Sequence, residues 1–119
     1  HPHLRIALSH GGGTLSTLLP RLRHAWRTFA PLREAMPDDP AETGRRFWVD
    51  SLVYDDDAVR RLVEFLGATQ VAIGSDFPFA IADGEPVERV RRLGLDAATA
   101  EGLLWRNALR WLGREPAMG

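Results

Sequence analysis

Cysteine and lysine are both absent from this 119-residue sequence, and it contains no long apolar run. The lack of cysteine excludes disulfides, thiolate metal sites and thiol nucleophiles, and it is compatible with a reducing compartment. No apolar stretch approaches the roughly 18 residues that cross a bilayer, and the first residues lack the plan of a signal peptide. We therefore expect a cytoplasmic protein with no membrane partner.

All 15 basic residues are arginine, and 16 acidic residues balance them to a net charge of -1. The arginines are scattered, and no basic stripe with interleaved aromatic residues is present. Nucleic-acid binding proteins concentrate their positive charge on one face. We attribute the arginine bias to coding composition and expect no nucleic-acid partner.

The hydrophobic pattern predicts a single α/β domain over residues 1–119. Apolar runs at 4–9, 47–52 and 70–75 are typical of buried strands, and helical spacing follows each of them. Predicted helices and loops are, in order, a helix over 14–34 bent or interrupted at Pro20, a polar loop over 36–46, a helix from Asp55 to Gly67, a short helix over 86–93, and a last helix from Asp96 to Gly113.

Alternating strands and helices favour right-handed parallel crossover units. Three strands cannot close a sheet, and a closed eight-stranded (β/α)8 barrel takes roughly 250 residues. The sequence therefore predicts a partial barrel, a fragment, or one contributor to an assembly.

Two ionisable residues follow strand ends, where parallel α/β folds place their reactive groups. His10 comes after the first predicted strand and Asp76 after the third. A histidine and an aspartate that converge there are suitable ligands or acid–base groups for a metal such as zinc. The alternative is that His10 is a loop residue bonded to backbone. Asp50, near the end of the middle strand, is expected to tie down loop amides.

Other patterns give weaker hypotheses. The run His10-Gly11-Gly12-Gly13 is similar to the oxyanion loop of lipase-type esterases, but the required Gly-x-Ser-x-Gly elbow is missing. His1 and His3 stand roughly 20 Å from His10, at the other end of an extended strand. We expect neither of them to share a site with His10.

Four segments in order carry a family resemblance: residues 4–13, 47–51, 71–79 and 107–108. They resemble the carboxyl-terminal part of the amidohydrolase-related (amidohydrolase 2) family, which includes aminocarboxymuconate-semialdehyde decarboxylase. Gly-Ser-Asp-Phe-Pro combined with the upstream His-Gly-Gly-Gly is fairly specific to that family. The resemblance covers nearly the whole chain and implies the last three strands of a (β/α)8 barrel of the TIM type.

The resemblance also implies roles for three residues. The aspartate matching Asp76 ligates a catalytic zinc, and the histidine matching His10 is the acid–base catalyst. The arginine matching Arg21 binds a substrate carboxylate in the neighbouring subunit's site, which favours a small-molecule carboxylate substrate and a homodimer, or assembly with the missing barrel half. The family's other metal ligands, a His-x-His and a later histidine, would lie upstream of His1.

We expect the parent protein to be a metal-dependent decarboxylase of an unsaturated or aromatic carboxylic acid. Two alternatives stay open: a hydrolase of a lactone or amide ring, which would use the same groups, and a non-catalytic half-barrel scaffold. Because catalytic zinc needs three protein ligands, we expect the isolated chain to bind zinc weakly and to be inactive.

Overall fold

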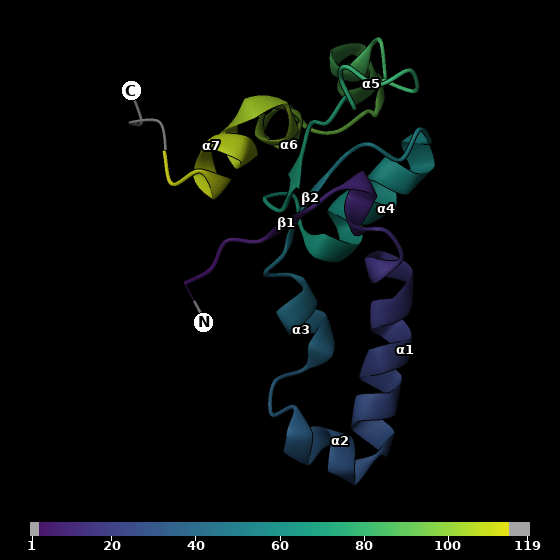
Figure 1. Cartoon of the computed structure of the whole chain (residues 1–119), viewed down its shortest axis with the longest axis vertical. Coiled ribbons are helices and arrows are strands. Elements are labelled where there is room, and N and C mark those ends of the chain that lie inside the picture. Colours follow the sequence, from purple (N-terminus) through teal and green to yellow (C-terminus); the bar gives the residue numbers. More distant parts are fainter. Residues whose placement is uncertain (1–2, 115–119) are drawn as a thin grey trace.

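A parallel sheet of three strands, in the order β1-β2-β3, lies at the centre of the computed structural model, which describes residues 3–114 (Figure 1). The strands are β1 (Ala7–Leu8), β2 (Trp48–Asp50) and β3 (Val71–Ala72). Ala7 pairs with Trp48, and Val49 pairs with Val71. The predicted α/β class with parallel strands is confirmed, and each strand lies within its predicted range but is shorter.

The strands are short because the chain leaves the sheet soon after it enters. Ladder hydrogen bonds extend one residue further, since Trp48 N donates to Ile6 O at 2.9 Å and Ser51 N to Ala72 O at 2.8 Å. Beyond β3, Ile73 N donates instead to Leu103 O of the last helical segment at 2.8 Å. The residue after β3 is therefore hydrogen-bonded to a helical segment and not to a strand.

Helices connect and cover the strands, in an order close to the predicted one. They are the 3-10 turn η1 (His10–Gly12), α1 (Leu15–Thr28), α2 (Ala30–Ala35), α3 (Pro40–Gly44), α4 (Asp56–Leu66), α5 (Pro86–Arg92), α6 (Ala97–Glu101), the π-helical turn η2 (Gly102–Arg106) and α7 (Asn107–Trp111). Among residues 3–114, none of the helices is long and apolar enough to span a membrane.

The prediction of an interruption at Pro20 is wrong. Helix α1 runs through Pro20, and the chain breaks at Phe29, whose backbone is extended at φ -116° and ψ 104°. An internal proline removes one helical hydrogen bond, but the neighbouring Leu19 is buried against Gly44 of α3, and this packing holds the helix in place. Figure 1 shows α1, α2 and α3 forming an arm that extends away from the sheet.

The segment predicted as a polar loop over 36–46 contains α3. Asp39 caps this helix by accepting a hydrogen bond from Ala41 N at 2.9 Å, and Pro40 occupies its first turn. Aspartate followed by proline is a helix-start pattern. Asp39 also accepts from Arg23 Nε at 2.7 Å, and this bond ties α3 to α1.

The core lies between the sheet and the helices around it. Its buried members come from α1, β2, α4, β3, α5 with the residue that follows it, and η2: Leu19, Val49, Val59, Leu62, Leu66, Val71, Val90, Leu93 and Leu103. The predicted start and end of α4 are confirmed, since Asp55 accepts from Ala58 N at 2.7 Å and Gly67 follows its last residue with φ +109°.

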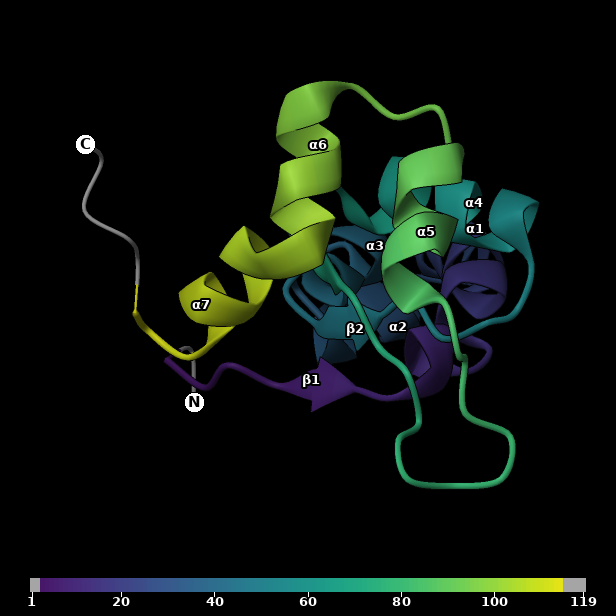
Figure 2. The ribbon, with the colours of Figure 1, turned by 90° about the horizontal axis from the view of Figure 1, so that it is seen from above.

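The last helix begins as predicted, with Asp96 accepting a hydrogen bond from Thr99 N at 3.0 Å. It passes through the η2 π-turn and continues as α7 to Trp111, two residues before Gly113. Next to this turn the buried Asn107 donates to Ala68 O at 2.7 Å and to Val71 O at 2.6 Å. The Asn107 side chain therefore joins the last helix to the start of β3. Figure 2 shows α6 and α7 beside the sheet, with the loop between β3 and α5 extending beyond it.

Candidate functional site

His10 and Asp76, predicted to converge from two strand ends, are in contact. His10 follows β1 in the η1 turn, and Asp76 lies in the loop after β3. His10 Nε2 lies 3.4 Å from Asp76 Oδ1. This distance is longer than a strong hydrogen bond. The imidazole is 65% exposed and the carboxylate 18% exposed, so the pair can meet a ligand from solvent on the histidine side.

Both residues have left-handed backbone conformations, with φ 56° at His10 and φ 58° at Asp76. Such conformations are uncommon outside glycine and cost free energy. They matter because Leu8 packs against the helix-covered core with Val49, so strict alternation would place His10 on that same side. The left-handed turn breaks the alternation and brings His10 to Asp76.

Asp50 holds the loop that carries His10. Its carboxylate accepts hydrogen bonds from His10 N at 3.0 Å, Gly11 N at 2.9 Å and Leu52 N at 3.1 Å. The prediction that Asp50 ties down loop amides is confirmed. Gly74 is needed opposite it, because a Cβ at that position would lie 2.9 Å from the Asp50 Cβ.

The glycines after His10 also have a structural explanation. Gly11 has φ +62°, and a Cβ there would lie 2.5 Å from Val53 Cγ1 and 2.9 Å from Leu62 Cδ1. Only glycine fits such a crowded left-handed position. The His-Gly-Gly-Gly run therefore packs the loop against α4 and leaves the histidine exposed.

Tyr54, the chain's single tyrosine, is a residue of this site that sequence reasoning missed. It lies in the loop after β2 with φ 55°, and its hydroxyl donates to the Ile81 carbonyl. Partial desolvation of the phenol, followed by the nearby negative charges of Asp76 and Asp83, raises the pKa of Tyr54. The sequence signal that could have identified Tyr54 is its position shortly after a predicted strand.

The remaining sequence candidates lie away from this pair. Arg21 is exposed on α1, and no hydrogen bond or ion pair within residues 3–114 joins it to His10 or Asp76. His3 is exposed before β1, and His24 is exposed on α1. His1 lies outside the described residues.

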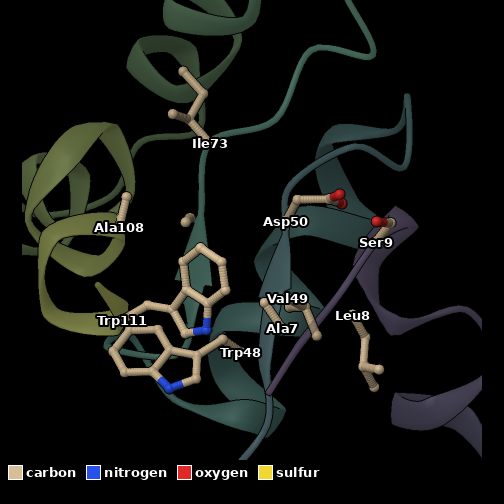
Figure 3. Close-up of a pocket in the computed structure, with 10 residues that line it drawn as sticks. Ala7, Leu8, Ser9, Trp48, Val49, Asp50, Ile73, Ala108 and Trp111 are labelled. Atoms are coloured by element: carbon tan, nitrogen blue, oxygen red, sulfur yellow. The ribbon is translucent and has the colours of Figure 1, made fainter. Parts of the chain in front are cut away.

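An open pocket of about 200 Å³ lies along the sheet, lined by residues of β1, β2, β3 and α7. Figure 3 shows the indoles of Trp48 and Trp111 at one end of it, and Asp50 with Ser9 at the other. Trp111 Nε1 donates to Arg5 O at 3.1 Å, which fixes that ring. The pocket is therefore apolar at one end and polar at the end nearest His10.

The donor chemistry of the pair suits a divalent metal, because carboxylate oxygen and imidazole nitrogen are ordinary ligands of zinc and similar ions. Within residues 3–114, however, no group of three or more such side chains is placed to hold an ion. Catalytic zinc takes three protein ligands. Asp76 and His10 therefore fit a metal centre as part of its donor set.

Comparison with known proteins gives the context of this geometry. Residues 1–114 match the profile of the amidohydrolase family. The chain is 34% identical over 119 residues to a 2-amino-3-carboxymuconate-6-semialdehyde decarboxylase of Dictyostelium discoideum, covering 97% of this chain and 33% of the relative. The Caenorhabditis elegans decarboxylase of the same name is 30% identical over 115 residues, covering 93% and 28%. The chain thus spans about a third of the length of these relatives.

Solved structures match over the whole fold. An amidohydrolase of Mycobacterium avium subsp. paratuberculosis K-10 superposes with a TM-score of 0.78 at 28% identity, covering 95% of this chain and 29% of its own. A 2,6-dihydroxybenzoate decarboxylase from Rhizobium gives 0.79 at 21%, covering 95% and 36%. A dihydroxybenzoic acid decarboxylase from Polaromonas, solved with manganese and the inhibitor 2-nitroresorcinol, gives 0.78 at 20%, covering 98% and 36%. The last two matches concern the fold alone.

Proposed function

The chain belongs to the amidohydrolase family, and from this premise we propose that it forms the last three strands of the barrel of a metal-dependent decarboxylase. The substrate class is an unsaturated or aromatic carboxylic acid. One observation carries the proposal: His10 Nε2 lies 3.4 Å from Asp76 Oδ1, at the carboxyl ends of two parallel strands. Two curated relatives that cover most of the chain are named as decarboxylases of such an acid.

Asp76 is the metal ligand in this proposal, and the other ligands come from parts of the enzyme outside this chain. A bound divalent cation would supply Lewis-acid polarisation of the substrate's oxygens. We expect zinc, and manganese is the alternative to test because the Polaromonas decarboxylase contains it. The limited exposure of the carboxylate, 18%, suits a ligand that faces the inside of a site.

His10 is the acid–base group. Decarboxylation breaks the bond between the substrate carbon and its carboxylate, carbon dioxide leaves, and the carbon takes a proton. Protonated His10 can deliver that proton from Nε2, since the imidazole is exposed while its backbone amide is fixed by Asp50 at 3.0 Å. The backbone of His10 is therefore fixed, while its exposed ring can contact a bound substrate.

Arg21 binds the substrate carboxylate, acting in the site of a neighbouring copy in a homodimer. The guanidinium suits this role because it is planar and can pair with both carboxylate oxygens. It is exposed on α1, in the arm that extends away from the sheet (Figure 1). This exposure leaves it accessible to a second subunit.

The test uses the enzyme that contains this chain and a panel of carboxylated aromatic and unsaturated acids. We expect carbon dioxide release with at least one of them, and a loss of about 100-fold or more in kcat in His10→Ala, with the metal content unchanged. Opening of a lactone or amide ring without carbon dioxide would assign a hydrolase. Unchanged turnover in His10→Ala would remove His10 from the reaction, and no turnover of any substrate would favour a scaffold.

A further inference from the structure

The loop between β3 and α5 contains Asp76 and extends beyond the sheet (Figure 2). The two sides of this loop meet at its base, because Asp83 N donates a hydrogen bond to Ser75 O at 2.8 Å. Ser75 is the residue directly before Asp76. The position of Asp83 therefore affects, through one hydrogen bond, the backbone next to the proposed metal ligand.

Arg89 of α5 binds Asp83 at the base of the loop. Its Nε donates to Asp83 Oδ2 at 2.6 Å, and its Nη1 donates to Asp56 Oδ1 at 3.0 Å. Asp56 lies in the first turn of α4, where the helix dipole favours a carboxylate. A planar guanidinium can bind two carboxylates at once through different nitrogens. Arg89 thus joins the base of the loop to the start of α4.

This connection is shielded from solvent. The side chain of Asp83 is 9% exposed and that of Arg89 is 15% exposed. The second oxygen of Asp83 accepts a hydrogen bond from Glu85 N at 3.0 Å, so both oxygens of this carboxylate are bound. Charge-assisted hydrogen bonds of this kind are short and strong. Because α4 packs into the core through Val59 and Leu62, the base of the loop is fixed to a rigid part of the molecule.

We propose that Arg89 is a positioning residue, which places Asp76 for metal binding by fixing the base of its loop to α4. This inference rests on the proposed function, in which Asp76 is a metal ligand. The contact of its carboxylate with His10 is long, 3.4 Å, so the place of the carboxylate depends on the backbone that carries it. Binding sites need their groups within about 0.5 Å of the productive geometry. Arg89 itself touches neither metal nor substrate.

The test uses two variants of the enzyme that contains this chain. Arg89→Met removes the connection but leaves the buried Asp83 carboxylate without its cation, which is strongly destabilising. The double variant Arg89→Met/Asp83→Asn removes the connection without an unpaired charge at Asp83, and its amide oxygen can still accept from Glu85 N. Asp56 keeps a cation in both variants, because Arg92 Nε donates to it at 2.9 Å.

Three measurements follow the loop and the metal site separately. Hydrogen exchange of the metal-free enzyme, read by mass spectrometry of peptides covering residues 75–85, should be about 10-fold faster or more in the double variant. Cobalt(II) and zinc affinities, measured by competition with a chromogenic chelator, should weaken about 10-fold or more. The visible bands of the cobalt form should shift, because the carboxylate ligand has moved. An affinity and a spectrum equal to those of the parent enzyme would overturn the proposal, whatever the exchange rate.

Arg60→Met is the matched control for a general loss of stability. Arg60 Nε donates to Leu93 O at 2.8 Å and so joins α4 to the residue after α5, but none of its hydrogen bonds within residues 3–114 reaches the loop between β3 and α5. This variant should lower the melting temperature and leave metal affinity and spectrum unchanged. If it weakens metal binding as much as the double variant does, Arg89 acts on stability alone and the proposal fails.

Asp76→Asn separates this inference from the proposed function. If Asp76→Asn keeps full metal affinity, Asp76 is no ligand, and the proposed metal site fails together with the role of Arg89. If Asp76→Asn loses affinity and the double variant does not, the role of Arg89 alone is wrong. A loss of affinity in both, with none in Arg60→Met, is the expected result.

Discussion

The backbone conformations of single residues determine the geometry of this site. From the sequence, His10 and Asp76 could be predicted to follow strand ends, and Asp50 to bond loop amides. The mutual approach of the pair could not be derived by alternation, because Leu8 faces the helix-covered core and His10 would share its side. Left-handed turns at both residues correct the direction. Tyr54 was not predicted as a residue of the site, because a left-handed backbone is not expected at a tyrosine.

Asp50 is the residue on which the position of His10 depends most directly. We expect Asp50→Asn to reduce the free energy of unfolding by about 2 kcal/mol, since an anionic acceptor of three amide bonds is replaced by a group with one neutral acceptor oxygen. Turnover should fall as well, because the His10 loop loses its anchor. Urea unfolding and kcat measure the two effects.

Asp38→Asn is the matched control for this change. Asp38 is 69% exposed and pairs with Arg46 at 3.6 Å, so its replacement should alter stability by less than about 1 kcal/mol. Equal effects of the two substitutions would show that the three amide bonds of Asp50 contribute nothing specific.

At the scale of elements, caps and turns were the most predictable features. Asp55, Asp96 and Gly67 mark helix ends as expected, because local hydrogen bonds and backbone freedom act there within a few residues. The continuity of α1 through Pro20 depends instead on the burial of Leu19 against Gly44, 25 positions away in the sequence. A contact between residues so far apart in the sequence cannot be predicted from local sequence patterns.

Ion pairs connect α4 and α5 to the loop between β3 and α5, which contains Asp76. Arg89 donates to Asp83 at 2.6 Å and to Asp56 at 3.0 Å, and all three side chains are less than a third exposed. The hydrogen bond from Arg89 holds the pKa of Asp83 below its ordinary value of 3.8. A carboxyl whose folded pKa is lowered stabilises the fold above its unfolded pKa, and this contribution is lost as the pH falls through the folded value.

We therefore expect Asp83→Asn to cost about 1–3 kcal/mol in free energy of unfolding at pH 7, with the difference from the parent shrinking below about pH 3.8. Urea unfolding at pH 7 and pH 3 measures it. Asp57→Asn is the control, since the Asp57–Arg60 pair is 76% and 42% exposed and should contribute little. A difference that stays constant with pH would contradict the assignment of this stability to the ionised carboxylate.

At the scale of the whole molecule, several large apolar side chains are exposed. Leu4 is 63% exposed and Leu112 52% exposed, beside the end of the sheet where Trp111 bonds to Arg5. Leu18 on α1 is 44% exposed, and Phe29, which follows α1, is 60% exposed. In the barrel that we propose, strands and helices outside this chain would cover such surfaces.

The same proposal has a consequence for metal binding by the 119-residue chain alone. Within residues 3–114 the site offers one carboxylate and one imidazole, and two donors do not make the three-ligand set of catalytic zinc. We expect the purified chain to lose added zinc during gel filtration, as measured by elemental analysis of the protein peak. We also expect it to show no decarboxylase activity, as measured by carbon dioxide release. Asp76→Asn should then behave like the parent chain, because little affinity remains to be lost. One zinc retained per chain, and released by Asp76→Asn, would mean that these residues complete a metal centre without the rest of the barrel.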